Sequence, residues 1–202
     1  MFYETNDHHG LKHNPFKSLI VPRPIGWVSS QDSDGVVNLA PYSYFNGVGS
    51  EPPTVMFASE GTHTEGDFKD SATNVRETGE FVCNLATWEL REAMNATSAQ
   101  VPRSVDEFTL AELTPMASRL VKPPRVKESP VHLECTHLKT VELPSNDPRR
   151  PNLVVFGRVV GIHIDDSIIA DGMIDMDAFR PIARLGYMDY TLVDNVFTME
   201  RP

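Results

Sequence analysis

Small hydroxyl side chains, an amide, an aromatic ring and a lysine gather in residues 23–74. The run Arg23–Ser30 ends in two serines, and Asn38–Phe45 combines an amide, a small alanine, a proline, tyrosines and a serine. Lys69 stands just before Ser71, the expected N-cap of a helix. Hydroxyl groups, the unpaired N–H groups of a helix start and a cation are the groups that bind phosphate. The segment therefore predicts a site for a flat, amphipathic, phosphorylated ligand.

A hairpin is expected to position the first part of this segment. Residues 24–30 alternate in character as a strand does, and 31–35 is a turn of Asp, Ser and Gly. Residues 36–45 then form the second strand, in which Pro41 indicates an edge strand or a bulge, because proline cannot donate a ladder hydrogen bond. Residues 46–53 are predicted to be a loop.

The rest of the chain predicts further strands and a few helices. The expected elements are strands over 54–59, 81–85, 131–136 and 153–164, and helices over 72–78 (stopped by Gly79), 89–99 and 105–113. Ser104 and Glu107 have the spacing of a capping box for the last helix. Residues 88–125 thus form a helical excursion from a mainly β chain with few helices. Regularly spaced strands and an early hairpin favour a small antiparallel barrel.

Length and charge restrict the class of protein. A chain of 202 residues fits one domain, taken as 1–202 with a polar N-terminal segment at 1–18. The formal net charge of −10 disfavours nucleic acid and anionic membranes as partners. Cys83 and Cys135 lie in apolar runs and are interpreted as buried free thiols. No signal-peptide pattern or membrane-length apolar run occurs, so the cytoplasm is the expected location.

Flavin mononucleotide (FMN) matches the ligand chemistry predicted above. Its ring needs a flat apolar flank and polar groups at one edge, and its phosphate needs hydroxyls and a cation. The residues that could face the ring are Asn38, Ala40, Tyr42 and Ser43, and those that could serve the phosphate are Ser29, Ser30, Lys69 and Ser71. A hairpin with an edge proline and an ordinary capped helix remains the alternative for each piece taken alone. Asp70 would repel a phosphate, so it is expected to cap the helix or pair with a base.

Other kinds of chemistry find little support. No strained Gly-x-Ser-x-Gly nucleophile elbow occurs. The histidines beyond the N-terminal segment are dispersed, at His63, His132, His137 and His163. The carboxylates of 165–177 lack the spacing of a calcium-binding loop and are interpreted as solvated turns. The sequence therefore predicts no catalytic residue and no metal site.

Taken together, these segments resemble the flavin reductase-like proteins of the FMN-binding split-barrel fold. The resemblance rests on the order and spacing of Arg23–Ser30, Asn38–Phe45, Glu51–Pro53, Lys69–Asn74 and Gly79–Asn84, with weaker similarity at Phe156–Gly161 and Pro181–Tyr187. It implies a six-stranded antiparallel split barrel that forms a homodimer, with FMN near the dimer interface.

The resemblance also implies roles for individual residues. Ser29 and Ser30 would lie near the phosphate or ribityl chain, Asn38, Ala40, Tyr42 and Ser43 would face the ring, and Lys69, Ser71 and Asn74 would serve the phosphate, with Arg184 as a further candidate. Two departures stand out. Residues 151–153 are Pro-Asn-Leu where short-chain flavin reductases carry an Asp-His pair, which weakens the case for a nicotinamide site of their type. Tyr187 replaces a glycine found in many relatives, and its ring could narrow the pocket.

The function predicted from these residues is that of an FMN-binding oxidoreductase. Hydride transfer from NADH or NADPH to flavin N5 needs no acid–base residue, since the cofactor carries the chemistry. Two alternatives remain open. One is an FMN-carrying electron-transfer protein with a protein redox partner, and the other is a non-catalytic flavin binder.

Overall fold

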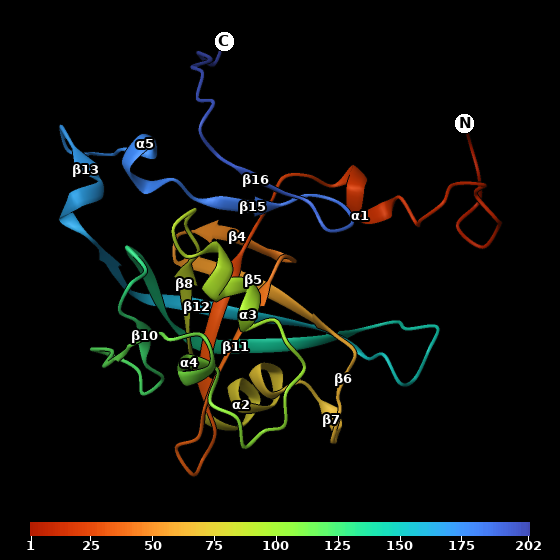
Figure 1. Cartoon of the computed structure of the whole chain (residues 1–202), viewed down its shortest axis with the longest axis horizontal. Coiled ribbons are helices and arrows are strands. Elements are labelled where there is room, and N and C mark those ends of the chain that lie inside the picture. Colours follow the sequence, from red (N-terminus) through yellow and green to blue (C-terminus); the bar gives the residue numbers. More distant parts are fainter.

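A seven-stranded antiparallel sheet forms the centre of the molecule. The computed structural model describes residues 1–202, except for the side chain of Asp67. The strand order is β3-β2-β8-β11-β12-β5-β4, and Figure 1 shows the long strands β11 and β12 crossing the middle of the view. The strand bounds are β2 Gly26–Gln31, β3 Val37–Tyr42, β4 Phe45–Ser50, β5 Pro53–Glu60, β8 Glu80–Leu85, β11 Val131–Leu143 and β12 Asn152–Ile164.

The expectation of a six-stranded barrel is wrong in its strand count, and β4 is the additional strand. Its residues 46–50 belong to the expected loop 46–53, and the structure buries only Phe45 of this strand. It nevertheless pairs with β5 from Phe45–Phe57 to Ser50–Pro53, with a register shift between the two glycines. Because β4 and β3 are the two ends of the strand order, the sheet is not a closed six-stranded ring.

The early hairpin forms as predicted. Strands β2 and β3 pair in antiparallel register from Gly26–Tyr42 to Gln31–Val37. Pro41 stands opposite Trp27 in β3, and β3 is an edge strand of the sheet. The interpretation of Pro41 as an edge proline is therefore confirmed.

Strand β2 separates two apolar clusters. Val28 belongs to one cluster, with Phe57, Phe81 and the helix residue Val75. Trp27, the preceding residue, belongs to the other cluster. That second cluster also contains Leu39, Met94, Phe108, Val126 and Ile182. Since neighbouring strand residues point to opposite faces, β2 is covered on both sides.

Helix α2 spans Asp70–Thr78 and begins slightly earlier than predicted. Lys69 is its N-cap residue, and Ser71 lies inside the first turn, so the expected Ser71 cap is wrong. Gly79 ends the helix with φ 78°, the left-handed conformation that favours glycine, as predicted. Asp70 accepts a hydrogen bond from Arg103 Nε at 2.7 Å, which confirms its pairing with a base.

The excursion contains two short helices, α3 (Arg91–Ala96) and α4 (Glu107–Leu110). The predicted capping box is wrong, because Asp106 is the N-cap and accepts from Phe108 N–H at 2.9 Å. Glu107 instead accepts a hydrogen bond from the backbone N–H of Leu39 in β3 at 3.2 Å. The tertiary contact with β3 thus replaces the local contact that the spacing suggests.

A small sheet of order β1-β15-β16 lies beside the central one. Arg23 in β1 links the chain on either side of this sheet. Its buried guanidinium donates to the carbonyl of Ile20, before β1, and to that of Leu185, after β15, each at 2.8 Å. The remaining bounds are β1 Arg23–Pro24, β15 Ile182–Arg184, β16 Tyr190–Leu192, β6 Thr62–His63, β7 Gly66–Phe68, β9 Pro115–Met116, β10 Arg125–Val126, β13 Ile169–Ala170, β14 Met173–Ile174, α1 Phe16–Leu19, α5 Met176–Phe179 and the 3-10 helix η1 Asp166–Ile168.

Cys83 and Cys135 are buried free thiols, as expected. Among the described residues, no helix has the length and apolar character needed to cross a membrane.

Close packing at Gly157 generates a stability prediction. A Cβ at this position of β12 would overlap the ring of the fully buried Phe81, with Phe81 Cε1 2.5 Å away and Cys135 Cβ 3.3 Å away. We expect Gly157→Ala to lower the free energy of unfolding by about 1–3 kcal/mol, the usual cost of overpacking a core. Gly47→Ala in β4 is the matched control, since its Cβ would meet nothing within 4 Å. Urea unfolding of both variants checks this, and equal stabilities would contradict it.

Candidate functional site

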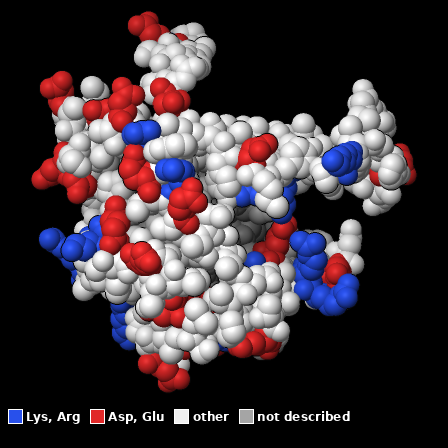
Figure 2. Space-filling model, in the orientation of Figure 1, with Lys and Arg blue, Asp and Glu red and all other residues white. Residues whose placement is uncertain are grey.

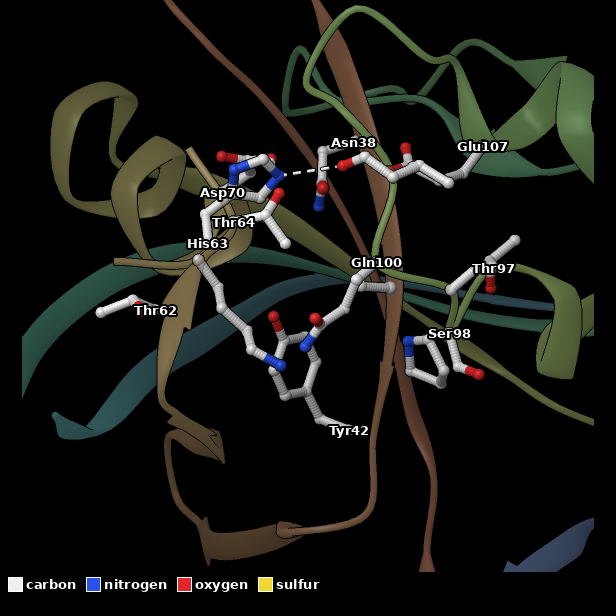
Figure 3. A pocket seen from close by; sticks show the side chains of 15 residues that line it. Asn38, Tyr42, Thr62, His63, Thr64, Asp70, Thr97, Ser98, Gln100 and Glu107 are labelled. Carbon is white, nitrogen blue, oxygen red and sulfur yellow. Dashed lines mark hydrogen bonds and ion pairs between the residues drawn. The ribbon is translucent and has the colours of Figure 1, made fainter. Parts of the chain in front are cut away.

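A cavity of about 100 Å³ lies against the edge strand β3, and we call it the Lys69 cavity. Figure 3 shows its lining side chains, which come from β3, the β6–β7 hairpin, the start of α2, the segment after α3 and the first residue of α4. The lining residues are Asn38, Ala40, Pro41, Tyr42, Thr62, His63, Thr64, Lys69, Asp70, Thr97, Ser98, Ala99, Gln100, Val101 and Glu107. Three of the predicted ring-facing residues and Lys69 thus meet at one place.

Lys69 brings a cation into this cavity. Burial lowers the pKa of its ammonium, an effect that Glu60 opposes and that Arg150 and Lys17 reinforce. Among the described side chains, none accepts a hydrogen bond from Lys69 or forms an ion pair with it. Two carboxylates, Asp70 and Glu107, line the same cavity, and Asp70 is paired with Arg103 at 2.7 Å. Figure 2 shows Lys and Arg side chains around a hollow on the visible face, which also carries many acidic side chains.

The segment after α3 forms the wall opposite β3. Thr97 Oγ1 accepts a hydrogen bond from Trp27 Nε1 at 2.9 Å, which anchors the segment to the apolar cluster. His63 Nδ1 accepts from the N–H of Glu65 at 3.1 Å, so its Nε2 carries the proton donated to the Val101 carbonyl at 3.0 Å. Hydrogen bonds at both ends therefore hold this wall in place.

Sequence reasoning missed this wall and the hairpin residues around His63. The only signal was the run Thr97-Ser98-Ala99 directly after an amphipathic helix, whose small side chains allow close approach of a ligand. Nothing in the spacing indicated that residues 97–101 lie beside β3. The helical excursion at 88–125 thus lines the cavity.

A second cavity of about 320 Å³, the Arg184 cavity, shares Pro41 and Ser98 with the first. Ser43 and Arg184, two of the predicted site residues, line it together with the ring of Tyr187. Arg184 donates hydrogen bonds to the Tyr190 hydroxyl and to the Tyr187 carbonyl. The two cavities are thus neighbours along β3.

Four predicted site residues lie behind the Lys69 cavity instead of lining it. They are the buried residues Ser29, Ser30, Ser71 and Asn74. Ser29 donates to the Pro124 carbonyl at 2.5 Å, and Asn74 Nδ2 donates to Ser30 Oγ at 3.1 Å. These hydrogen bonds join β2 to the excursion and to α2.

Asn38 and Tyr42 link this buried layer to the cavity. Asn38 Nδ2 donates to Ser71 Oγ at 2.8 Å. Burial raises the pKa of the Tyr42 hydroxyl, and hydrogen bonds to Ser71 and Ser59 oppose that rise. The hydroxyl of Tyr42 therefore serves the packing of α2 against the sheet, and its ring packs at a tilt against that of Phe57, with centroids 4.9 Å apart.

Comparison with known proteins identifies the family. The family model for the Flavin reductase like domain matches residues 18–183, and the chain belongs to this family. An uncharacterized protein of Aquifex aeolicus is 42% identical over 169 residues, which cover 83% of each chain. Nitrilotriacetate monooxygenase component B from Bacillus cereus superposes with a TM-score of 0.87 at 31% identity, covering 98% of this chain and 99% of the other.

The split-barrel part of the fold prediction is confirmed. A Shewanella frigidimarina protein with a split barrel domain superposes with a TM-score of 0.80 at 24% identity, covering 93% of this chain and 90% of the other. At this level of identity the likeness concerns the fold alone. The seven-stranded sheet described above is thus a variant of the architecture that the sequence predicted.

The residues present suit a flavin nucleotide. Lys69 is a partly buried cation without a described protein partner, and burying such a group is unfavourable until an anion pairs with it. Thr62, Thr64 and Ser98 add hydroxyl groups to the same lining. The adjoining Arg184 cavity has the volume typical of small-molecule sites.

Glu107 generates a prediction on the pH dependence of stability. Burial raises the pKa of this carboxyl, partly offset by the Leu39 N–H, so the folded state binds its proton more tightly than the unfolded state. Stability from this group is therefore lost as pH rises from the ordinary glutamate value of about 4.3 through the raised value. Glu107→Gln keeps an acceptor for Leu39 and removes the charge. We expect it to gain stability relative to wild type as pH rises from about 4 to about 7.

Urea unfolding over this pH range measures the difference between variant and wild type. The matched control is Glu77→Gln at an exposed position of α2. A difference for Glu107→Gln that stays constant with pH would contradict the assignment.

Proposed function

We propose that the protein is an FMN-binding flavin reductase that accepts hydride from NADH or NADPH at flavin N5. The observation that carries this proposal is Lys69, a partly buried cation without a described partner, in a cavity beside β3. Membership of the flavin reductase family supports the flavin class of the ligand. The proposal treats residues 1–202 as one cytoplasmic domain that forms a homodimer, with FMN near the interface.

The phosphate end of FMN is assigned to the Lys69 cavity. Lys69 would pair with the phosphate, and the hydroxyl of Thr64 would donate to one of its oxygens. Asp70 is compatible with this arrangement, because Arg103 pairs with its carboxylate and offsets its charge.

The ring end is assigned to the edge of β3 and the Arg184 cavity. Ala40 and Pro41 offer a low apolar flank there, and Ser43 and Arg184 offer polar groups. Asn38 and Tyr42 line the cavity and hold its floor in place. Ser29, Ser30, Ser71 and Asn74 enter the proposal as supports of that floor, since their hydrogen bonds fix β2 and α2 behind it.

Bound flavin would supply the hydride-accepting chemistry, and the chain would supply binding and orientation. Holding two flat rings in a near-attack geometry can contribute several kcal/mol, and no side chain has to carry a proton.

Two alternatives keep the same FMN site and differ in the source of electrons. The protein could carry FMN as an electron-transfer protein with a protein redox partner, or bind flavin without catalysis. Residues 151–153 support these two alternatives, because Pro-Asn-Leu stands where short-chain flavin reductases carry an Asp-His pair.

Stopped-flow mixing of FMN-loaded protein with NADH and with NADPH tests the reductase proposal. Rapid bleaching of the flavin absorbance by either nucleotide is the expected result. A loaded protein that reacts with neither would exclude the reductase and leave the two alternatives. A protein that takes up no FMN would overturn all three.

Removal of Lys69 should affect FMN and riboflavin differently. We expect Lys69→Ala to weaken FMN binding by about 1.5–3 kcal/mol, the range for hydrogen bonds to charged groups, and to leave riboflavin binding nearly unchanged. Titration calorimetry with both ligands measures this, with exposed Lys122→Ala as the control. Equal weakening of both ligands would show that Lys69 does not contact the phosphate.

A further inference from the structure

A third cavity of about 360 Å³ lies between α3 and the β15–β16 pair, and we call it the Trp88 cavity. We propose that it is a binding site for a planar aromatic anion, the class of co-substrate that would exchange electrons with the flavin. The cavity shares Met94, Asn95, Arg184, Met188 and Tyr190 with the Arg184 cavity. The proposal rests on the proposed function for the identity of the flavin, whereas the binding chemistry is argued from the lining residues of the Trp88 cavity alone.

Two arginines stack on aromatic rings in this cavity. The Arg91 guanidinium lies 4.1 Å from the centroid of the Trp88 ring, and the Arg184 guanidinium lies 4.4 Å from that of Tyr190. All four side chains line the same cavity. A stacked guanidinium presents a flat face and N–H donors together, which suits a ring that carries a carboxylate or phosphate.

The charges that face the two arginines leave the cavity positive. Arg91 donates to the Trp88 carbonyl at 2.7 Å and lies 3.5 Å from Glu92, whose side chain is 82% exposed. Glu92 is the one carboxylate among the lining residues. Arg184 donates to two neutral oxygens, those of Tyr190 and Tyr187, and to no described carboxylate. An anion would therefore meet two cations and one solvated carboxylate.

The floor of the cavity is apolar. Met94 and Ile182 are buried to 2% and 5% exposure and belong to the same apolar cluster as Trp27. Leu192 packs against that cluster and also lines the cavity. A flat ring can rest on this floor while its anionic group reaches the arginines at the rim.

Two kinds of redox ligand share this chemistry. A nicotinamide dinucleotide combines aromatic rings with phosphates, and an aromatic carboxylic acid combines a ring with a carboxylate. Because the Arg184 cavity connects the Trp88 cavity to the proposed ring site, either could lie beside the flavin. The experiment below separates the two sources.

Trp88 provides a direct readout, because its side chain is 40% exposed and that of the only other tryptophan, Trp27, is fully buried. Flavin-free protein is titrated with benzoate, with its neutral analogue benzamide, and with NAD⁺, and tryptophan fluorescence is recorded. We expect saturable quenching, with benzoate binding about tenfold or more tightly than benzamide, since hydrogen bonds to a charged group stabilise it more. NAD⁺ binding tighter than benzoate identifies the nucleotide as the source, and the reverse order identifies the aromatic acid.

Three variants test the placement of the ligand. Trp88→Phe should abolish the quenching, and Arg91→Gln should weaken benzoate about tenfold. The matched control is Arg180→Gln, which removes a nearby charge that pairs with Glu89 at 3.3 Å and does not line the cavity. Circular dichroism confirms that each variant is folded. Equal weakening of benzoate binding by Arg91→Gln and Arg180→Gln would overturn the site, because it would show that Arg91 acts only through long-range electrostatics and does not contact the ligand.

Two further outcomes are informative. No quenching by any of the three probes overturns the proposal, and so does Trp88 emission that changes with protein concentration alone, since a second copy of the chain would then cover the cavity. The outcome is independent of the flavin proposal. Benzoate binding without FMN uptake would retain this site and overturn the flavin site, and FMN uptake without quenching would do the opposite.

Discussion

Strand β2 is covered on both faces, and the rest of the structure depends on this constraint. Trp27 and Val28 are both fully buried, yet they belong to different apolar clusters. Each cluster therefore needs its own covering element. Helix α2 covers the side of Val28, and the helices of the excursion cover the side of Trp27. The two coverings meet beyond the edge strand β3, and the Lys69 cavity lies at that meeting point.

This arrangement explains why the cavity carries a partly buried cation. Lys69 must lie there because it is the residue on which α2 begins, and α2 is fixed by burial of Ala72 and Val75. An ammonium held in such a place loses hydration, which the lowered pKa of Lys69 reflects. A bound anion would restore favourable electrostatics at this point. Packing in the core thus determines the position of the cation that we propose pairs with the phosphate.

Sequence predicted the elements whose signals are local. The β2–β3 turn, the edge position of Pro41 and the helix stop at Gly79 all follow from the conformational limits of a few neighbouring residues. Strand β4 could not be predicted, because its pairing with β5 supplies what its glycine-containing sequence lacks. The same holds for Glu107, where a hydrogen bond to Leu39 across the fold replaces the predicted local cap.

The candidate site shows the same limit. A serine near a phosphate-binding segment can face the ligand or bind the backbone behind it, and the two cases have the same spacing. Ser29 is an example of the second case, because its hydroxyl donates to the carbonyl of Pro124, a residue far along the chain. The wall at 97–101 was missed for a related reason. Its position depends on the hydrogen bond between Trp27 and Thr97, which joins residues that no local pattern connects.

Tyr187 shows how an expectation from sequence resemblance can be examined in physical terms. It adopts φ 55°, in the left-handed region that a glycine enters at little cost and that costs another residue on the order of 1 kcal/mol. A glycine would therefore suit the backbone better at this position. In this chain the strained turn directs the Tyr187 carbonyl to Arg184, and the half-exposed ring lines the Arg184 cavity. The cost of the conformation is thus coupled to the position of Arg184, the arginine that the Arg184 and Trp88 cavities share.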